Sequence, residues 1–106
     1  MIRAIYRWEV QPGAEDAFVA AWTQGTEVIR GRVKGAHGSV LLRNRNKPSE
    51  FIAIARWESF ADWQAFSDAK SPAPQAFQCV EEISTFVSTE VCDELYDLAF
   101  EDSEVI

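Results

Sequence analysis

The chain has 106 residues, of which 47% are hydrophobic and 25% charged, and these fractions are ordinary for one globular domain. Its formal net charge of -7 disfavours phosphate backbones and anionic lipid surfaces, so we predict neither nucleic-acid nor membrane binding. No stretch approaches the roughly 20 apolar residues of a membrane span, and nothing at the start resembles a signal peptide, so we expect a cytoplasmic location.

The first third of the chain predicts a strand followed by a long helix. Residues 1–10 are rich in β-formers and alternate with a period of two, and Pro12-Gly13 ends this strand in a turn. Residues 14–33 carry apolar side chains at spacings of three and four. Acidic residues in the first turn and basic residues in the last suit the helix dipole, and Gly35 is a plausible terminator.

The middle of the chain predicts a hairpin and a capped helix. Residues 39–44 and 51–57 have the composition of short strands, and the turn signal at 46–49 joins them. Ser59 then predicts the cap of a helix over 60–69, because its hydroxyl can accept a backbone N–H that has no partner within the helix.

The end of the chain predicts a short helix and a last strand. The proline-rich segment 71–74 breaks the preceding helix, a short helix follows over about 75–82, and a strand covers about 86–98. Residues 101–106 have the composition of a frayed acidic tail. The order β-α-β-β-α-β, with one extra short helix, predicts an α+β ferredoxin-like fold with an antiparallel four-stranded sheet. We expect one domain over 1–106, with its core at about 2–98.

The two hairpin strands carry apolar residues on both faces, unlike a sheet that has one solvated face. Val40 and Leu42 alternate with Leu41, and the second strand alternates Ile52 and Ile54 with further apolar residues. One chain has only enough helices to cover one face. We therefore expect the other face to meet a second copy, which predicts a homodimer.

Three segments at fold-determining positions carry a resemblance to a known family. They are YRWEVQPG at 6–13 followed by Phe18 and Trp22, GAHGS at 35–39, and AIARWES at 53–59. Together they resemble the antibiotic biosynthesis monooxygenase superfamily over roughly residues 2–98. The resemblance implies a dimeric α+β barrel with a pocket between sheet and helices in each subunit. That superfamily includes cofactor-free oxygenases of polycyclic phenols, haem-degrading enzymes and members without known activity.

The resemblance implies two alternative functions. One is a cofactor-independent monooxygenase that acts on a small aromatic or phenolic molecule, and the other is a non-catalytic dimeric ligand-binding or accessory domain. The haem-degrading branch uses a strand Asn, a helix Trp and a helix His. These positions fall at Tyr6, near Phe66 and near Ala76, where the required residues are missing, so we expect no haem chemistry and no cofactor.

Aromatic residues are the main candidates for a substrate site. Tyr6 is a candidate catalytic residue, because its hydroxyl can hold an ionised substrate oxygen in the pocket that the resemblance places beside the first strand. Trp8, Trp63 and Phe66 are candidate substrate-binding residues as aromatic walls. The alternative for all four is ordinary core packing, with the tyrosine hydroxyl tethered by a neighbour.

His37 is the only histidine and the second candidate catalytic residue, as a general base. The alternative is an exposed histidine in a glycine-flanked loop. One histidine without a carboxylate cluster predicts no metal site, and Cys79 and Cys92 are expected to be reduced thiols.

Arg43 and Arg56 lie on the predicted hairpin strands and have two alternative roles. The first is an ion pair with Glu9 or Glu90 across the sheet or the dimer contact. The second is to hold an anionic substrate.

Overall fold

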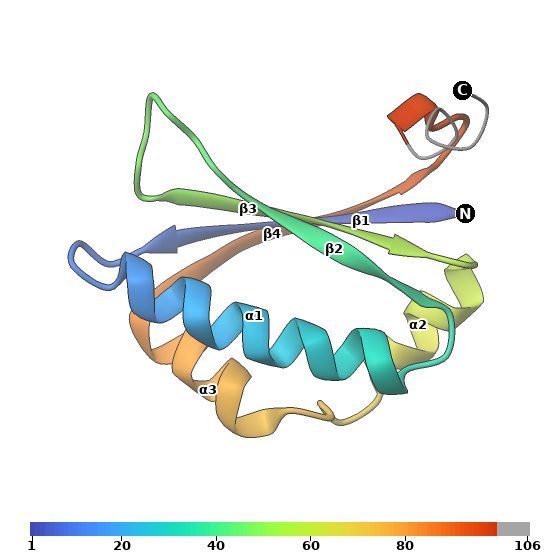
Figure 1. Cartoon of the computed structure of the whole chain (residues 1–106), viewed down its shortest axis with the longest axis horizontal. Helices are drawn as coiled ribbons and strands as arrows, with labels where there is room; N and C mark the ends of the chain where they lie inside the picture. Colours follow the sequence, from blue (N-terminus) through green and yellow to red (C-terminus); the bar gives the residue numbers. More distant parts are fainter. Residues whose placement is uncertain (100–106) are drawn as a thin grey trace.

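The computed structural model describes residues 1–99. Its elements are β1 (Ile2–Val10), α1 (Glu15–Arg32), β2 (Ala36–Arg43), β3 (Glu50–Trp57), α2 (Phe60–Asp68), α3 (Pro74–Ile83) and β4 (Ser84–Asp93). The strands of this part form one antiparallel sheet in the order β2-β3-β1-β4. Helices α1, α2 and α3 all lie on the same side of it (Figure 1). This arrangement confirms the predicted α+β ferredoxin-like fold with its extra short helix.

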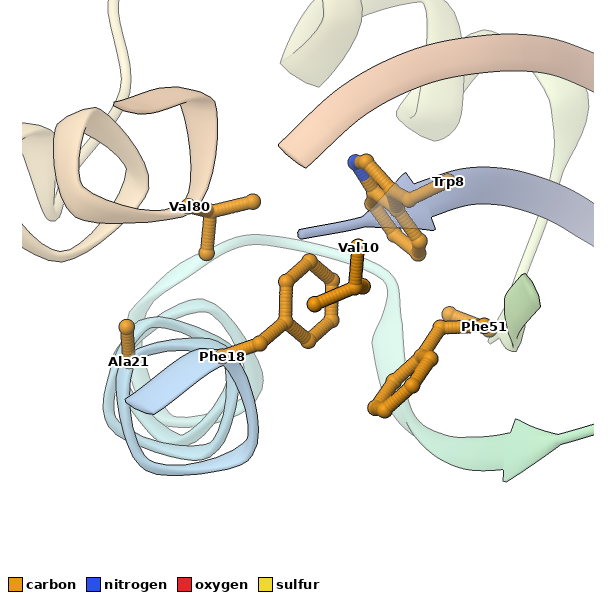
Figure 2. Close-up of a cluster of buried hydrophobic side chains, with 7 residues drawn as sticks. Trp8, Val10, Phe18, Ala21, Phe51 and Val80 are labelled. Carbon is orange, nitrogen blue, oxygen red and sulfur yellow. The ribbon is translucent and has the colours of Figure 1, made fainter. Parts of the chain in front are cut away.

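The main core forms where the first half of α1 crosses the sheet. Phe18 on α1 is fully buried, and its ring meets Trp8 of β1 and Phe51 of β3 edge-on, with centroids 5.3 and 5.0 Å apart. Val10 and Val80 close this cluster from the end of β1 and from α3 (Figure 2). The predicted period of two on β1 is therefore correct, because Ile2, Ala4, Trp8 and Val10 are the buried residues of that strand.

The packing of α3 against α1 depends on one glycine. A Cβ atom at Gly25 would lie 2.6 Å from the Phe77 ring of α3, closer than any side chain tolerates. Glycine therefore lets the Phe77 ring approach the backbone of α1 directly. The same Phe77 ring lines a cavity between the helices and the sheet.

Local signals at the helix ends are confirmed. The Ser59 hydroxyl accepts the backbone N–H of Asp62 at 3.1 Å, as expected of a cap. Gly35 has φ +83, a left-handed conformation that glycine adopts readily just after a helix.

Two strand limits differ by three or more residues from those predicted. Strand β4 ends at Asp93 rather than near residue 98. Asp93 pairs with Ile2, the first residue of β1, so β1 offers no further residue for pairing. Strand β2 begins at Ala36 rather than Ser39, because Ala36 pairs with Trp57 before an irregular stretch. The tail predicted at 101–106 lies outside the described residues.

The face of the sheet opposite the helices carries an apolar stripe, which we call the outer stripe: Ile5, Val40, Leu42, Ile52 and Ile54. Ile54 pairs with both Ile5 and Val40, and Ile52 pairs with Leu42, so the stripe is continuous across β1, β3 and β2. Val40 and Leu42 are 46% and 44% exposed in the single chain. The apolar character predicted for both faces of the hairpin is therefore present.

The stripe ends in a charged cluster where β4 leaves the sheet. Glu94 accepts hydrogen bonds from Arg56 at 2.8 and 2.9 Å and from Arg3 at 2.7 Å, and Arg3 also contacts Asp97. Within the chain, Arg56 pairs with Glu94 rather than with the predicted Glu9 or Glu90, because the chain turns after Asp93 and brings Glu94 onto Arg56. Glu90 pairs with Arg7 instead. A pairing across the dimer contact stays a prediction.

Glu94 is expected to contribute stability that depends on pH. Hydrogen bonds from Arg56, opposed by desolvation and helped by Arg3, lower the pKa of its carboxyl from 4.5 to about 2. A lowered pKa in the folded protein stabilises it above pH 4.5, and this stabilisation is lost as the pH falls towards 2. We expect Glu94→Gln to lower Tm at pH 7. The difference in Tm between the variant and wild type should shrink as the pH falls from 4.5 towards 2. Glu90→Gln, in a more exposed pair, is the control with a smaller effect; a Tm difference that stays constant with pH would contradict the prediction.

Candidate functional site

A cavity of about 330 Å³ lies between the sheet and the helices. This volume is within the range of small-molecule sites. Both layers contribute to its lining, with Tyr6, Trp8, Ser39, Ala53, Ala55, Trp57 and Phe86 from the sheet and Trp22, Thr26, Arg30, Phe66, Phe77 and Glu81 from the helices. The walls are mainly aromatic and the floor is formed by small alanines, so the cavity suits a flat apolar ligand.

The Tyr6 hydroxyl accepts a hydrogen bond from a neighbouring indole, and its own proton remains available for donation to a ligand. Trp63 on α2 donates its indole N–H to the Tyr6 oxygen at 2.9 Å. Desolvation, partly offset by this hydrogen bond, raises the pKa of the Tyr6 phenol above 10.0. The phenol is therefore protonated at neutral pH. Since an indole N–H only donates, Tyr6 can still donate its own proton to a ligand oxygen in the cavity.

Two further polar atoms of lining residues are buried without a partner among residues 1–99. They are the Ser39 hydroxyl on β2 and the Trp57 indole N–H on β3. A buried polar group that lacks a hydrogen bond costs about 1–3 kcal/mol, so such groups are rare in folded proteins. Both residues contribute to the lining of the cavity, but these two atoms themselves have almost no accessible surface, so a ligand does not reach them without a shift of their neighbours.

Charged side chains reach the cavity from the two helices that enclose it. Arg30 comes from the end of α1 and Glu81 from α3, and both are exposed residues. They bring one positive and one negative group from the helices; Arg56 of β3 also belongs to the lining, but its guanidinium is bonded to Glu94. Glu81 adds a possible proton acceptor that the sequence had not singled out.

The predicted site residues fall in three places. Tyr6, Trp8 and Phe66 line the cavity, although Trp8 is 9% exposed and also belongs to the core. Trp63 is not among the lining residues and instead holds the Tyr6 hydroxyl.

His37 is not among the lining residues either. It lies within the irregular start of β2 rather than in the predicted loop, because that strand begins at Ala36. Its Nε2 atom is 2.7 Å from the Glu58 carboxylate, in an exposed pair. Its neighbours Ala36 and Gly38 do line the cavity, so His37 stands beside the lining.

No metal site accompanies these groups in the described part of the chain, where no three His, Cys, Asp or Glu side chains form a cluster suited to a metal ion. Within the same residues, no helix is both long and apolar enough to cross a membrane.

Sequence reasoning missed Ser39, Trp57, Arg30 and Glu81 as functional candidates. Ser39 belonged to a motif that indicated only the fold, and Trp57 was counted with the aromatic core. One usable signal was present: Ala53 and Ala55 place small residues on the helix-facing side of a central strand, where a filled core would carry larger ones.

A ferredoxin-like sheet that encloses an aromatic cavity with a few hydrogen-bonding groups defines an α+β fold with a candidate small-molecule site. The model of the antibiotic biosynthesis monooxygenase family matches residues 1–80. The chain therefore belongs to this family. No curated protein matches it significantly.

Solved structures extend the likeness to almost the whole chain. SnoaB, a cofactor-independent oxygenase from Streptomyces nogalater, is 19% identical with a TM-score of 0.76, and the match covers 92% of this chain and 96% of SnoaB. A protein from Bordetella bronchiseptica, provisionally assigned as an antibiotic biosynthesis monooxygenase, is 22% identical with a TM-score of 0.77, over 90% of this chain and 97% of that one. At these identities the likeness establishes the fold.

Proposed function

We propose that the chain is a cofactor-independent monooxygenase that oxidises a small aromatic phenol or anthrone bound in the cavity. The observation that carries this proposal is the Tyr6 hydroxyl, which is desolvated, oriented by Trp63 and free to donate its proton. A preorganised donor in a water-poor site stabilises negative charge as it develops on a substrate oxygen. Membership of the family and the fold shared with SnoaB support the same reaction class.

The substrate itself must supply the electrons in such a reaction. When an anthrone loses a proton from its CH₂ group, the resulting carbanion delocalises its charge onto the carbonyl oxygen and can reduce dioxygen directly. The ring CH₂ group then becomes a carbonyl: one oxygen atom bonds to carbon, and the other leaves as water with the two hydrogens. Anthrone and O₂ thus give anthraquinone and water, a balance that requires no external reductant.

Two residues are candidates for the proton acceptor of the proposed site. His37 is the sequence-based candidate and lies beside the lining, whereas Glu81 lines the cavity itself. Comparing the rates of His37→Gln and Glu81→Gln assigns the role, because only removal of the proton acceptor slows the deprotonation step.

The experiment that tests the proposal is oxygen uptake by metal-free protein. Chelator-treated enzyme is mixed with a panel of anthrones and polycyclic phenols, and consumption is followed with an oxygen electrode. We expect uptake above the uncatalysed rate and formation of the corresponding quinone. If no compound reacts faster with protein than without it, the oxygenase proposal is wrong.

The second candidate is a non-catalytic ligand-binding domain, which the position of the bases favours. The histidine stands outside the lining and the lining carboxylate is exposed, so the cavity holds no buried base among its described residues. Binding of an aromatic ligand without oxygen uptake would support this alternative.

We further propose that the outer stripe is covered by a second copy in a homodimer. Exposed, continuous apolar faces of this kind mark association surfaces. We expect twice the 12.0 kDa chain mass in sedimentation equilibrium at micromolar concentration, and a monomer for Ile54→Lys, since Ile54 lies centrally on the stripe. Val19→Lys, at an exposed apolar position on α1, is the control and should remain dimeric. A wild-type monomer would disprove the dimer.

A further inference from the structure

The cavity reaches the solvent beside α3. Four of its lining residues are exposed, namely Arg30, Ser71, Glu81 and Phe86. Arg30 lies near the end of α1, whereas the other three belong to the segment that runs from the α2–α3 connection through α3 into β4. We call this second group the α3 rim: Ser71, Glu81 and Phe86. A ligand that enters the cavity from water must pass residues that contact both, so the α3 rim marks an entrance.

Phe86 is the one apolar member of the α3 rim. The residue is 53% exposed, although it contributes to a largely aromatic lining. Its ring meets Trp8 edge-on, with centroids 6.0 Å apart, and this is its only ring contact within the described part of the chain. A large apolar side chain that lies half in water is only partly stabilised by packing. The Phe86 ring is therefore held on one side and open to solvent on the other.

A β-bulge in β4 turns Phe86 towards the cavity. Arg7 of β1 pairs with Ser88. The next residue of β1, Trp8, pairs with Phe86, so Val87 is an extra residue in β4. In an uninterrupted strand, Val87 would lie opposite Trp8 and Phe86 would point to the other face of the sheet. The bulge thus places a phenylalanine in the lining where a regular strand would place a valine, as bulges beside functional sites do when they re-aim a side chain.

The position of β4 in the sheet leaves room for the Phe86 ring to move. Strand β4 lies at the edge of the sheet and pairs only with β1 among the described strands. The ring can therefore turn away from Trp8 into solvent by a change of rotamer, without displacing a neighbouring strand. Trp8 itself is only 9% exposed and packs in the main core, so it forms the fixed side of the entrance.

We propose that Phe86 is a gate of the cavity, whose ring turns away from Trp8 to admit a ligand and returns to cover it. The residue then sets the rates of ligand entry and release rather than the identity of the ligand. The inference rests on the proposed function only in requiring that the cavity binds a ligand. It does not require catalysis, and it holds equally for a binding domain.

The test measures ligand exchange by stopped-flow quenching of tryptophan fluorescence, with anthraquinone-2-carboxylate as the probe. Trp8, Trp22 and Trp57 line the cavity and report its occupancy. We expect Phe86→Ala to raise the association rate constant by about ten-fold or more, because a minor open state that alone admits the probe is populated at about 10% or less. The dissociation rate constant should rise as well, since no ring then covers the bound probe, and Kd should change less than either rate constant.

Two substitutions in the same strand are matched controls. Phe86→Tyr keeps the ring and can place its hydroxyl in water, so we expect wild-type rate constants. Val87→Ala shortens a neighbour that is 59% exposed and does not line the cavity, and it too should leave both rate constants unchanged. All of these changes are at exposed positions, so the Tm of each variant should stay close to that of wild type.

Three outcomes would overturn the gate. An association rate constant that is unchanged or lower in Phe86→Ala would show that the ring is only part of the wall, because loss of a wall contact speeds release but not entry. Equal acceleration in Val87→Ala would mean that loosening of β4, and not the ring, speeds exchange. If neither wild type nor Phe86→Ala binds the probe, both the gate and the proposed ligand site fail, whereas loss of oxygen uptake alone would overturn only the oxygenase.

Discussion

Tyr6→Phe is expected to slow oxygen uptake by about 100- to 1000-fold, the usual cost of removing one donor to a developing oxyanion. The loss should appear in kcat more than in KM, because the negative charge develops in the transition state and is absent from the neutral bound substrate. Burial raises the pKa of the Tyr6 phenol above 10.0, so the donor is protonated at neutral pH. Rates at pH 6–9 should therefore fall by a similar factor throughout.

The chain offers a matched control in its other tyrosine. Tyr96 is 73% exposed after the end of β4, and Tyr96→Phe should leave the rate unchanged. Trp63→Phe removes the group that orients the Tyr6 hydroxyl but keeps the hydroxyl itself, so we expect an intermediate loss of rate. If oxygen is consumed and Tyr6→Phe reacts at the wild-type rate, the fold assignment survives and the role given to Tyr6 is wrong.

The fold was predictable because its main signals are local. The alternation on β1 and the spacing of three and four on α1 follow from where each side chain points along one element. The Ser59 cap likewise needs only a hydroxyl at the right distance from the helix start. Such features can be predicted without knowing which other elements the strand or helix packs against.

Features that depend on pairing were less predictable. The end of β4 is set by where β1 begins, and the pairing of Arg56 with Glu94 is set by how the chain leaves β4. The composition around residue 94 indicates neither the end of the strand nor the partner of Arg56. His37 illustrates the same limit, since its flanking glycines indicated a loop whereas pairing of Ala36 with Trp57 places it in β2.

The candidate site was only partly predictable, because its most informative property is a missing contact. Tyr6 was found through its strand and the family resemblance. The hydroxyl of Ser39 and the indole of Trp57 stand out only in the folded structure, whose described residues provide no partner for them. A sequence shows which groups can form hydrogen bonds but not which of them remain unbonded after folding.

Ala55→Leu is expected to block ligand binding while leaving the fold intact. Ala55 lies on the cavity floor and is half-buried, so a leucine side chain there extends into open space rather than into packed neighbours. A ligand would then have to overcome an overpacking cost of about 1–3 kcal/mol, which weakens its binding by about 5- to 150-fold. Titration with anthraquinone-2-carboxylate measures this loss, and the Tm should stay at or above the wild-type value.

The cross-strand neighbour of Ala55 provides the control. Ala4 pairs directly with Ala55, faces the same helices and is fully buried, but it does not line the cavity. Ala4→Leu should therefore destabilise the folded protein by about 1–3 kcal/mol, because no space is available for the added atoms. The two substitutions are identical in chemistry and adjacent in the sheet, so opposite effects on Tm would show that the space over Ala55 is a true cavity. A comparable loss of Tm in both variants would mean that the aromatic walls close over Ala55 in solution, and the proposed ligand site would then be wrong.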